Sequence, residues 1–315
     1  MEYYAQDEWF NRHDLDNLRL ENTAVALGVF DAMHLGHMEI VDTVVNYARE
    51  NNLKSVVYMF RNIPKSVVTN TDIKNVNLFK KRLRILYDRG VDIVVAERFT
   101  TDYMRIPYTE FVEKYLVEKF DARFVCAGFN YHYGYRGMGN TENLKELCAE
   151  HNIKVKICNC KSLECPVSST LIRQLIASGE MEEAAKYLGR YFSVTRRVER
   201  GAGLGHRIGF PTANIQLPDF HVVPKFGVYI SRAKVNGEWH RAITNVGGKP
   251  TVGSDKPCIE TYIFDCDENL YGKEIEIEFR RFLRPIQKFE SIKELESQLE
   301  QDKQSATEYF ESDFI

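Results

Sequence analysis

The stretch Gly201–Asn214, GAGLGHRIGFPTAN, combines glycines with residues that can hold a phosphate and a metal ion. Glycines let backbone N–H groups approach phosphate oxygens, and a nearby cation can pair with them. We expect these contacts from Gly201, Gly203, Gly205 and Arg207. Thr212 and Asn214 offer hard oxygen ligands of the kind that Mg²⁺ accepts. The stretch does not fit the G-x-x-x-x-G-K-[ST] pattern, so it predicts a polyphosphate-wrapping loop of another type.

A second candidate site lies at Gly28–His37, GVFDAMHLGH, which follows a predicted strand and runs into a predicted helix. Such a strand end and helix N-terminus bind anions, because unpaired N–H groups and the helix dipole point there. His34 and His37 can donate to phosphate oxygens, and Gly36 lets a nucleotide come close. We also expect nucleotide contacts from Gly28, Phe30 and Asp31. The alternatives are surface or capping histidines, or a metal-binding pair.

A third segment, Val167–Arg173 (VSSTLIR), opens another predicted helix. The hydroxyls of Ser168, Ser169 and Thr170 can cap that helix and contact phosphates. Arg173 can neutralise a pyrophosphate leaving group. Taken alone, the hydroxyls are explained more simply by capping. Together with the upstream His-x-Gly-His, they favour a role in handling a nucleotide.

Glu260 interrupts an apolar predicted strand, Ile259–Asp265. A carboxylate is costly to bury, and transfer of a phosphoryl group to a primary alcohol needs a carboxylate within reach of the hydroxyl. Taken alone, Glu260 is explained more simply by a solvent-facing position on a half-exposed strand. Together with the neighbouring motifs Asn245–Thr251 and Leu270–Gly272, it becomes a candidate general base.

These sites must be positioned by two domains of different kinds. Up to about residue 180, short β-rich runs alternate with amphipathic helical runs, which predicts a Rossmann-like α/β domain with a parallel sheet covered on both faces. Strands are expected at 24–30, 55–60, 92–95, 124–127 and 155–158, and helices from 40 to 48, from 77 to before 90, from 109 to 119 and from 141 to 151.

After Leu188 the pattern changes to strands separated by turns, with Asn236-Gly237 as a strong hairpin signal. This predicts a small antiparallel β-barrel followed by a helix from about 292 to 305. Barrel strands are expected at 191–199, 227–235, 239–246, 259–265 and 275–282. The expected domains are therefore 1–187 and 188–315.

Composition limits the class of protein. The chain has 315 residues, a formal charge of −3 and no apolar run of membrane-spanning length. Such a charge balance disfavours nucleic acid and anionic membranes as partners. The N-terminus lacks a signal-peptide pattern, and the seven cysteines, an odd number, suit reduced thiols. We expect a cytoplasmic enzyme that can form a homo-oligomer. Cys158, Cys160 and Cys165 lack a fourth ligand at zinc spacing, so buried or loop thiols are expected there.

The motifs together resemble those of the bacterial bifunctional riboflavin kinase/FMN adenylyltransferase (FAD synthetase) family. Gly209–Asn214 is similar to the G-F-P-T-A-N segment of riboflavin kinases, and His34–His37 to the H-x-G-H of nucleotidylyltransferases. Val167–Arg173 resembles the second nucleotide motif of FAD synthetases. The resemblance runs from about Val25 to Asp302, with the motifs in the family's order.

The resemblance implies that residues 188–315 phosphorylate riboflavin with ATP and residues 1–187 adenylylate the resulting FMN. It implies a magnesium ion on Thr212 and Asn214 and Glu260 as the base. It also implies flavin contacts from Asn130, Tyr131, Tyr133, Asn245, Arg284 and Phe289. The expected small-molecule partners are riboflavin, FMN and ATP.

The N-terminal half departs from the family pattern at Ala32, at Arg61-Asn62-Ile63 and at Asn130-Tyr131-His132. Two alternatives therefore stay open for that half. It can be a degenerate, non-catalytic flavin- or nucleotide-binding module, or a nucleotidylyltransferase of other specificity.

Overall fold

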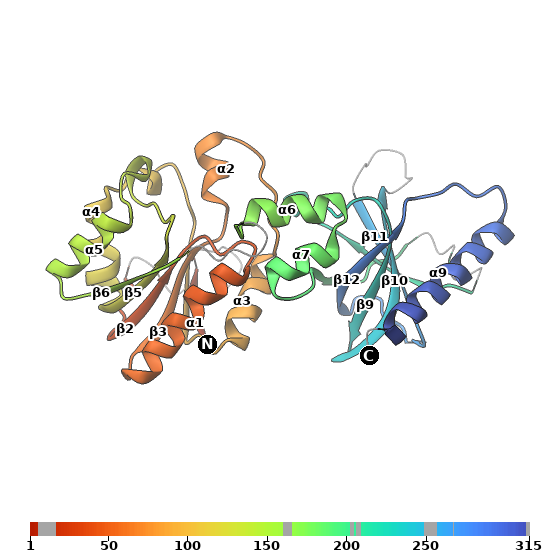
Figure 1. Ribbon diagram of the computed structural model, residues 1–315, viewed down its shortest axis with the longest axis horizontal. Coiled ribbons are helices and arrows are strands. Elements are labelled where there is room, and N and C mark those ends of the chain that lie inside the picture. The colour runs from red at the N-terminus through yellow and green to blue at the C-terminus, as the bar shows by residue number, and fades with distance from the viewer. Residues whose placement is uncertain are drawn as a thin grey trace. The chain divides into compact units, whose positions relative to one another are not determined.

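The computed structural model describes residues 1–5, 17–159, 166–201, 205, 209–248, 257–266 and 268–312. These residues divide into two compact units, Met1–Ser169 and Thr170–Ile315. Figure 1 shows an α/β arrangement in the first unit and curved antiparallel strands with a long helix in the second.

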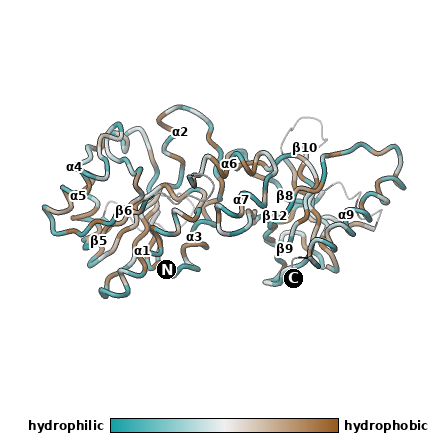
Figure 2. The backbone as a smooth tube through the Cα atoms, viewed as in Figure 1, coloured by the Kyte–Doolittle hydropathy of each residue, from teal (hydrophilic) through white to brown (hydrophobic). Residues whose placement is uncertain are grey.

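The first unit is built on a six-stranded parallel sheet with the order β1-β4-β3-β2-β5-β6. Its central strands are continuous apolar runs because both faces of the sheet are covered. Figure 2 shows hydrophobic stretches along these strands. The strands are β1 (Glu2–Ala5), β2 (Thr23–Leu27), β3 (Lys54–Phe60), β4 (Ile93–Glu97), β5 (Ala122–Gly128) and β6 (Lys154–Cys158).

Helices pack on both faces of this sheet. On one face, the apolar side of α1 (Leu35–Glu50) and residues of α3 (Phe79–Asp88) join the core. On the other face, α4 (Tyr108–Phe111), its π-helical continuation η2 (Val112–Lys119) and α5 (Thr141–Glu150) form a second core. The remaining short helices of this unit are α2 (Pro64–Thr69), η1 (Tyr103–Arg105) and η3 (Tyr135–Gly137).

The strand order places a topological switch point between β2 and β5. The chain passes from β2 to β3 and β4 on one side, and then returns to place β5 on the other side of β2. Loops that leave the carboxyl ends of such neighbouring strands form the usual ligand site of an open α/β sheet. Here these loops are 28–34 and 129–139, which carry two of the predicted motifs.

The second unit begins with α6 (Ser169–Ser178, from Thr170) and α7 (Met181–Leu188), which precede a six-stranded antiparallel sheet. Its order is β7-β12-β9-β10-β11-β8, and a bridge between Glu199, just beyond β7, and Asn214 of β8 nearly closes it into a barrel. The strands are β7 (Ser193–Arg197), β8 (Thr212–Gln216), β9 (Gly227–Val235), β10 (Glu238–Gly248), β11 (Pro257–Ile263) and β12 (Glu274–Arg284).

The last helix, α9 (Ile292–Ser312), packs on the outer face of this barrel. Its buried residues, which include Tyr309 and Phe310, contact apolar residues of β9 and β10. Inside the barrel, the hydroxyls of Ser231, Thr244 and Thr261 form a buried hydrogen-bonded chain. The inner and outer faces of β10 and β11 are therefore distinct.

Both expected fold classes are confirmed, with differences in detail. The Gly201–Asn214 stretch was expected to be a loop throughout, but Thr212 and Asn214 lie in β8 because Ala213 and Ile215 alternate into the barrel core. The sequence patterns do not predict β1, α2 or α7, and α9 continues beyond the predicted end at residue 305. None of the helices in the described ranges is long and apolar enough to cross a membrane.

Candidate functional sites

In the first unit, the loop after β2 is held in shape from inside. Phe30 and Met33 have left-handed φ angles of 50° and 52° and are fully buried. The carboxylate of Asp31 accepts a hydrogen bond from the backbone N–H of Val76 at 3.0 Å. The side-chain amide of Asn77 donates to the carbonyls of Asp31 and Ala32. The side chains of Phe30 and Asp31 are thus buried and shape the loop, and the nucleotide contacts expected of them remain a prediction.

The two histidines lie at the start of α1, at the carboxyl edge of the sheet. His34 is the N-cap, and its Nδ1 accepts a hydrogen bond from the backbone N–H of His37 at 3.2 Å. The two rings are stacked, with centroids 3.6 Å apart. The capping role that was one alternative is therefore present, and it fixes both rings over the helix N-terminus. A Cβ on Gly36 would meet only the His34 ring, at 3.4 Å, so the glycine is not required by crowding within the protein.

A buried arginine that the sequence patterns do not single out supports the loop after β3. Arg82 of α3 donates to the carbonyls of Phe60 and Arg61 at 2.8 Å each. Burial lowers the pKa of its guanidinium to about 10, while the nearby Asp31 carboxylate acts in the opposite direction. The family departures at Arg61 and Asn62 have local partners, since Arg61 lies over the Phe79 ring and Asn62 forms two hydrogen bonds with the Phe99 backbone.

The loop after β5 differs from its prediction. Tyr133 is buried in the core against Phe111, and Tyr131 stacks on Tyr133 with centroids 5.6 Å apart. Tyr133 therefore fills the core of this unit, and the flavin contact that the resemblance implies for it remains a prediction. Asn130 is exposed. The exposed large hydrophobic side chains of this loop are Phe129, Tyr135 and Met138, at 51%, 38% and 63%.

The hydroxyl segment lies where the two units divide. Ser168 precedes α6, Ser169 is its first residue, and Thr170 and Arg173 follow in the part that belongs to the second unit. The predicted helix start is confirmed. In the second unit, this helix and the next are held against the barrel by a hydrogen bond from the Lys225 N–H to the Ile176 carbonyl and by an ion pair between Glu182 and Arg281.

In the barrel, three predicted site residues form one row across neighbouring strands. Asn214 of β8 lies directly opposite Glu260 of β11, which lies directly opposite Asn245 of β10. Paired residues of antiparallel strands point to the same face, with Cβ atoms about 5 Å apart. That face is opposite the inner hydroxyl chain, because Thr244 and Thr261 are the neighbours of Asn245 and Glu260 in sequence. The pairing brings together residues up to 46 positions apart.

The side chain of Asn214 is confined on several sides. Its Nδ2 donates to the Thr212 carbonyl at 3.2 Å and lies 3.4 Å from the Thr212 Oγ1. The Cys258 Sγ lies 3.9 Å from its Oδ1. A Cβ on Gly201 would lie 2.4–2.7 Å from the amide atoms. Gly201 therefore makes room for the Asn214 amide, which is a more specific reason for the glycine than phosphate approach alone.

The other residues expected at the kinase site lie in the segment before β8 and at or after the end of β12. The Gly205 carbonyl accepts a hydrogen bond from the Phe210 N–H, and Gly203 and Arg207 lie outside the described residues. Arg284 continues the row through Val228 but forms a two-oxygen ion pair with Asp302 of α9, which is 2% exposed. Phe289 is half-buried with its ring near the Arg284 guanidinium. Arg284 is thus held in an ion pair within this unit.

The donor set on the row suits a hard cation that also binds a nucleotide. Thr212 and Asn214 provide neutral oxygens on one strand, and Glu260 provides a carboxylate beside them. Within the described ranges, no three or more His, Cys, Asp or Glu side chains are grouped so that they could hold a metal ion. Mg²⁺ commonly uses one or two protein oxygens together with substrate phosphates, so these residues fit it.

Comparisons with known proteins agree with this division of the chain. The riboflavin kinase family model matches residues 188–310, and the FAD synthetase family model matches residues 16–171. A bifunctional riboflavin kinase/FMN adenylyltransferase of Listeria monocytogenes is 35% identical and covers 92% of this chain and 93% of its own. The protein of the same name from Bacillus subtilis is 30% identical and covers 95% and 96%.

One solved structure matches over nearly the whole chain. A crystal structure from Streptococcus pneumoniae, whose title names a macrolide-efflux protein, has a TM-score of 0.87 and 28% identity and covers 98% of this chain and 99% of its own. That title names a different activity, whereas both family models and the curated relatives agree with each other. The chain belongs to the family of bifunctional riboflavin kinase/FMN adenylyltransferases, with an N-terminal FAD synthetase domain and a C-terminal riboflavin kinase domain.

Proposed function

We propose that the chain converts riboflavin to FAD in two ATP-dependent steps with a separate site for each. The barrel transfers the γ-phosphoryl group of ATP to the primary hydroxyl of riboflavin and forms FMN. The α/β unit then joins an adenylyl group from ATP to the FMN phosphate and releases pyrophosphate. The kinase domain is proposed to begin near residue 188 and the adenylyltransferase domain to span 1–187.

The Asn214–Glu260–Asn245 row is the observation that supports the kinase assignment best. A carboxylate directly beside an amide and a hydroxyl provides the base and the cation ligands in one place. We assign the base to Glu260, which accepts the proton of the riboflavin hydroxyl as the oxygen attacks the γ-phosphorus. Thr212 and Asn214 are assigned to the magnesium ion, which when bound neutralises charge on the phosphates.

For adenylyl transfer, the histidine pair is the main support. Stacked rings over a helix N-terminus at a sheet switch point suit the stabilisation of negative charge on the α-phosphate of ATP. His34 and His37 are proposed to hold that charge, and Ser168, Ser169, Thr170 and Arg173 to contact the departing pyrophosphate. No covalent intermediate is needed, because the FMN phosphate oxygen attacks directly as pyrophosphate leaves.

One assay tests the proposal against its alternatives. The protein is incubated with riboflavin and Mg-ATP, and riboflavin, FMN and FAD are separated by chromatography. FAD accumulation is expected. FMN without FAD would favour a degenerate N-terminal module, and neither product would reject both assignments. Incubation of supplied FMN with each nucleoside triphosphate in turn tests the remaining alternative, a nucleotidylyltransferase of other specificity. A cytoplasmic location and a homo-oligomeric state remain predictions.

A further inference from the structure

Two buried cysteines lie close together under α1 in the first unit. The Sγ atoms of Cys126 in β5 and Cys158 in β6 are 3.4 Å apart. Cys126 is fully buried and Cys158 is 4% exposed. Both belong to the core between the sheet and α1. Neither residue has a part in the two proposed reactions.

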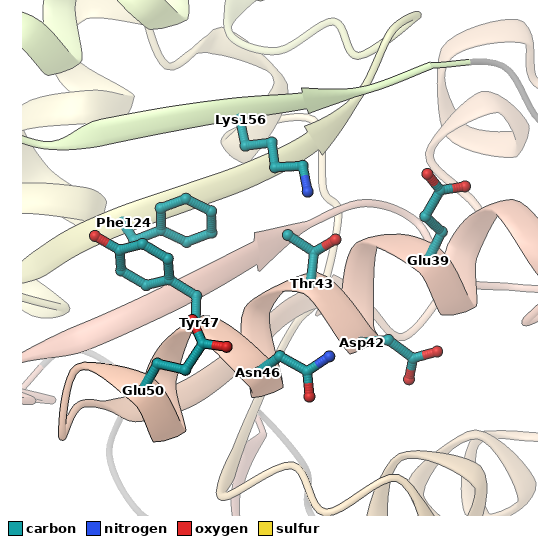
Figure 3. Close-up of a pocket in the computed structure, with 8 residues that line it drawn as sticks. All are labelled: Glu39, Asp42, Thr43, Asn46, Tyr47, Glu50, Phe124 and Lys156. Carbon is teal, nitrogen blue, oxygen red and sulfur yellow. The ribbon is translucent and has the colours of Figure 1, made fainter.

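An open surface pocket lies beside this pair, although neither cysteine lines it. Its volume is about 540 Å³, and its lining includes Thr43 of α1, Phe124 of β5 and Lys156 of β6. In Figure 3, Thr43 and Lys156 approach each other across the pocket from opposite elements. The Thr43 Oγ1 lies 4.0 Å from the Cys158 Sγ, and Lys156 pairs directly with Cys126 across the two strands. The dithiol therefore lies next to the pocket, with Cys158 on the nearer side.

The strand register disfavours a disulfide between these residues. Cys126 is opposite Lys156, and Cys158 is opposite Gly128, so the cysteines are offset by two residues. An offset of two residues along the strand and one strand across the sheet separates the Cα atoms of Cys126 and Cys158 by about 8 Å. A disulfide spans Cα atoms no more than roughly 7 Å apart. An atom that bridges the two sulfurs needs no such backbone movement.

The distance and the burial together favour one kind of bridging atom. At a bond length of about 2.3 Å, sulfurs 3.4 Å apart subtend an angle of about 95° at a bridging atom. Trivalent arsenic is pyramidal with bond angles near a right angle. Burial also raises the pKa of the Cys126 thiol, which disfavours a thiolate. An arsenical reacts with two neutral thiols and leaves a neutral product.

We propose that Cys126 and Cys158 form a capture site for trivalent organoarsenicals. Both S–H bonds and both As–OH bonds break, two As–S bonds form, and two waters leave, with no change in oxidation state. The aryl group of the reagent occupies the adjacent pocket. Because α1 carries His34 and His37 at its N-terminus, a group held between α1 and β6 displaces the proposed adenylyl site. This consequence, unlike the capture itself, rests on the proposed function.

The test uses the full chain and phenylarsine oxide at a one-to-one ratio, read by intact mass spectrometry. One adduct that survives desalting and is removed by 2,3-dimercaptopropanol is expected for the wild-type protein. Cys126→Ser and Cys158→Ser should each lose the stable adduct. Cys148→Ser, a buried cysteine of α5, and the double variant Cys160→Ser/Cys165→Ser should keep it. Peptide mapping of the wild-type adduct gives the same answer if a variant does not fold.

Absence of a wild-type adduct, or its persistence in either Cys126→Ser or Cys158→Ser, would overturn the capture site. Activity is measured separately on the modified protein. FAD formation from FMN should be lost and FMN formation from riboflavin retained. If a mapped adduct left FAD formation intact, the proposed displacement of the adenylyl site would be wrong while the capture site would stand.

Discussion

At the scale of single residues, the strongest assignment is Glu260, because its cross-strand neighbours are Asn214 and Asn245. Glu260→Gln keeps the shape of the side chain and removes its charge. We expect FMN formation to fall by roughly 10² to 10⁴, the usual contribution of a general base. Glu238→Gln, at the exposed start of β10, is the matched control. A folded Glu260→Gln protein with wild-type turnover would exclude the role.

Gly201 is the second residue-scale prediction. A methyl group there would overlap the Asn214 amide at 2.4–2.7 Å, so Gly201→Ala must displace the proposed magnesium ligand. We expect a higher Mg²⁺ concentration for half-maximal FMN formation and a lower maximal rate. The internal control is FAD formation from supplied FMN by the same protein, which should be unchanged. Unaltered Mg²⁺ dependence in the variant would show that Asn214 does not need this space.

At the scale of elements, the turn before β9 contains a buried titratable group. His221 is 1% exposed, and its Nδ1 lies 2.7 Å from the Val222 carbonyl. Burial lowers the pKa of its imidazole from 6.5 to about 4. The folded state thus disfavours the proton that the unfolded chain binds below pH 6.5, and stability falls as the pH drops from about 6.5 to 4. A shift of this size corresponds to roughly 3 kcal/mol at the acid end.

The measurement is urea unfolding of the barrel between pH 7.5 and 4. Trp9→Phe leaves Trp239 of β10 as the only tryptophan, so its fluorescence reports on this unit. His221→Gln keeps a buried polar side chain but cannot titrate, and it should flatten the loss of stability at acid pH. An equal acid loss in both proteins would place its origin in other groups.

The elements also show which parts of the fold a single sequence reveals. The strand over Gly227–Val235 was predicted at its observed bounds, because β-branched and aromatic residues there end at the Asn236-Gly237 turn. Strand β8 was missed, because glycines and Pro211 around Thr212–Gln216 suggest a loop, whereas pairing with β11 makes it a strand. The row of site residues could not be predicted either. It depends on the register between strands far apart in sequence, which side-chain patterns do not specify.

Local motifs identified the chemistry better than they identified individual contacts. The hydroxyl, amide and carboxylate of the proposed kinase site are all named from sequence, and the structure brings them together. By contrast, Tyr133 is expected to contact a flavin, but its side chain is buried and packs on Phe111. Asp302 and Arg82, which hold neighbouring side chains and carbonyls, carry no motif. Buried charges of this kind are recognised only when their partners are known.

At the scale of the whole molecule, the division into two units predicts separable activities. The compact second unit starts at Thr170, because α6 and α7 contact the barrel through Lys225 and Arg281. A fragment 170–315 should therefore fold and phosphorylate riboflavin. A fragment 189–315 lacks the two helices and should retain the activity with a lower melting temperature. Circular dichroism and an FMN assay on both fragments test this. A folded 170–315 fragment that binds neither riboflavin nor Mg-ATP would contradict the assignment of the kinase to this unit.

The two proposed sites also predict that FAD formation can be lost alone. The N-terminal departures are less disruptive than the sequence suggests: Ala32 is not among the residues with left-handed φ, and Asn62 is fully bonded to the Phe99 backbone. His34 and His37 lie stacked at the start of α1, where we propose that they bind phosphate. We therefore expect the wild-type protein to make FAD, with an altered affinity for the flavin.

His37→Ala should abolish FAD formation from FMN, because it removes a charge-stabilising donor and leaves the His34 cap in place. The same variant should convert riboflavin to FMN at the wild-type rate, which serves as its folding control. Wild-type protein that makes FMN but no FAD, whatever the flavin concentration, flavin redox state or metal, would leave the α/β unit as a binding module.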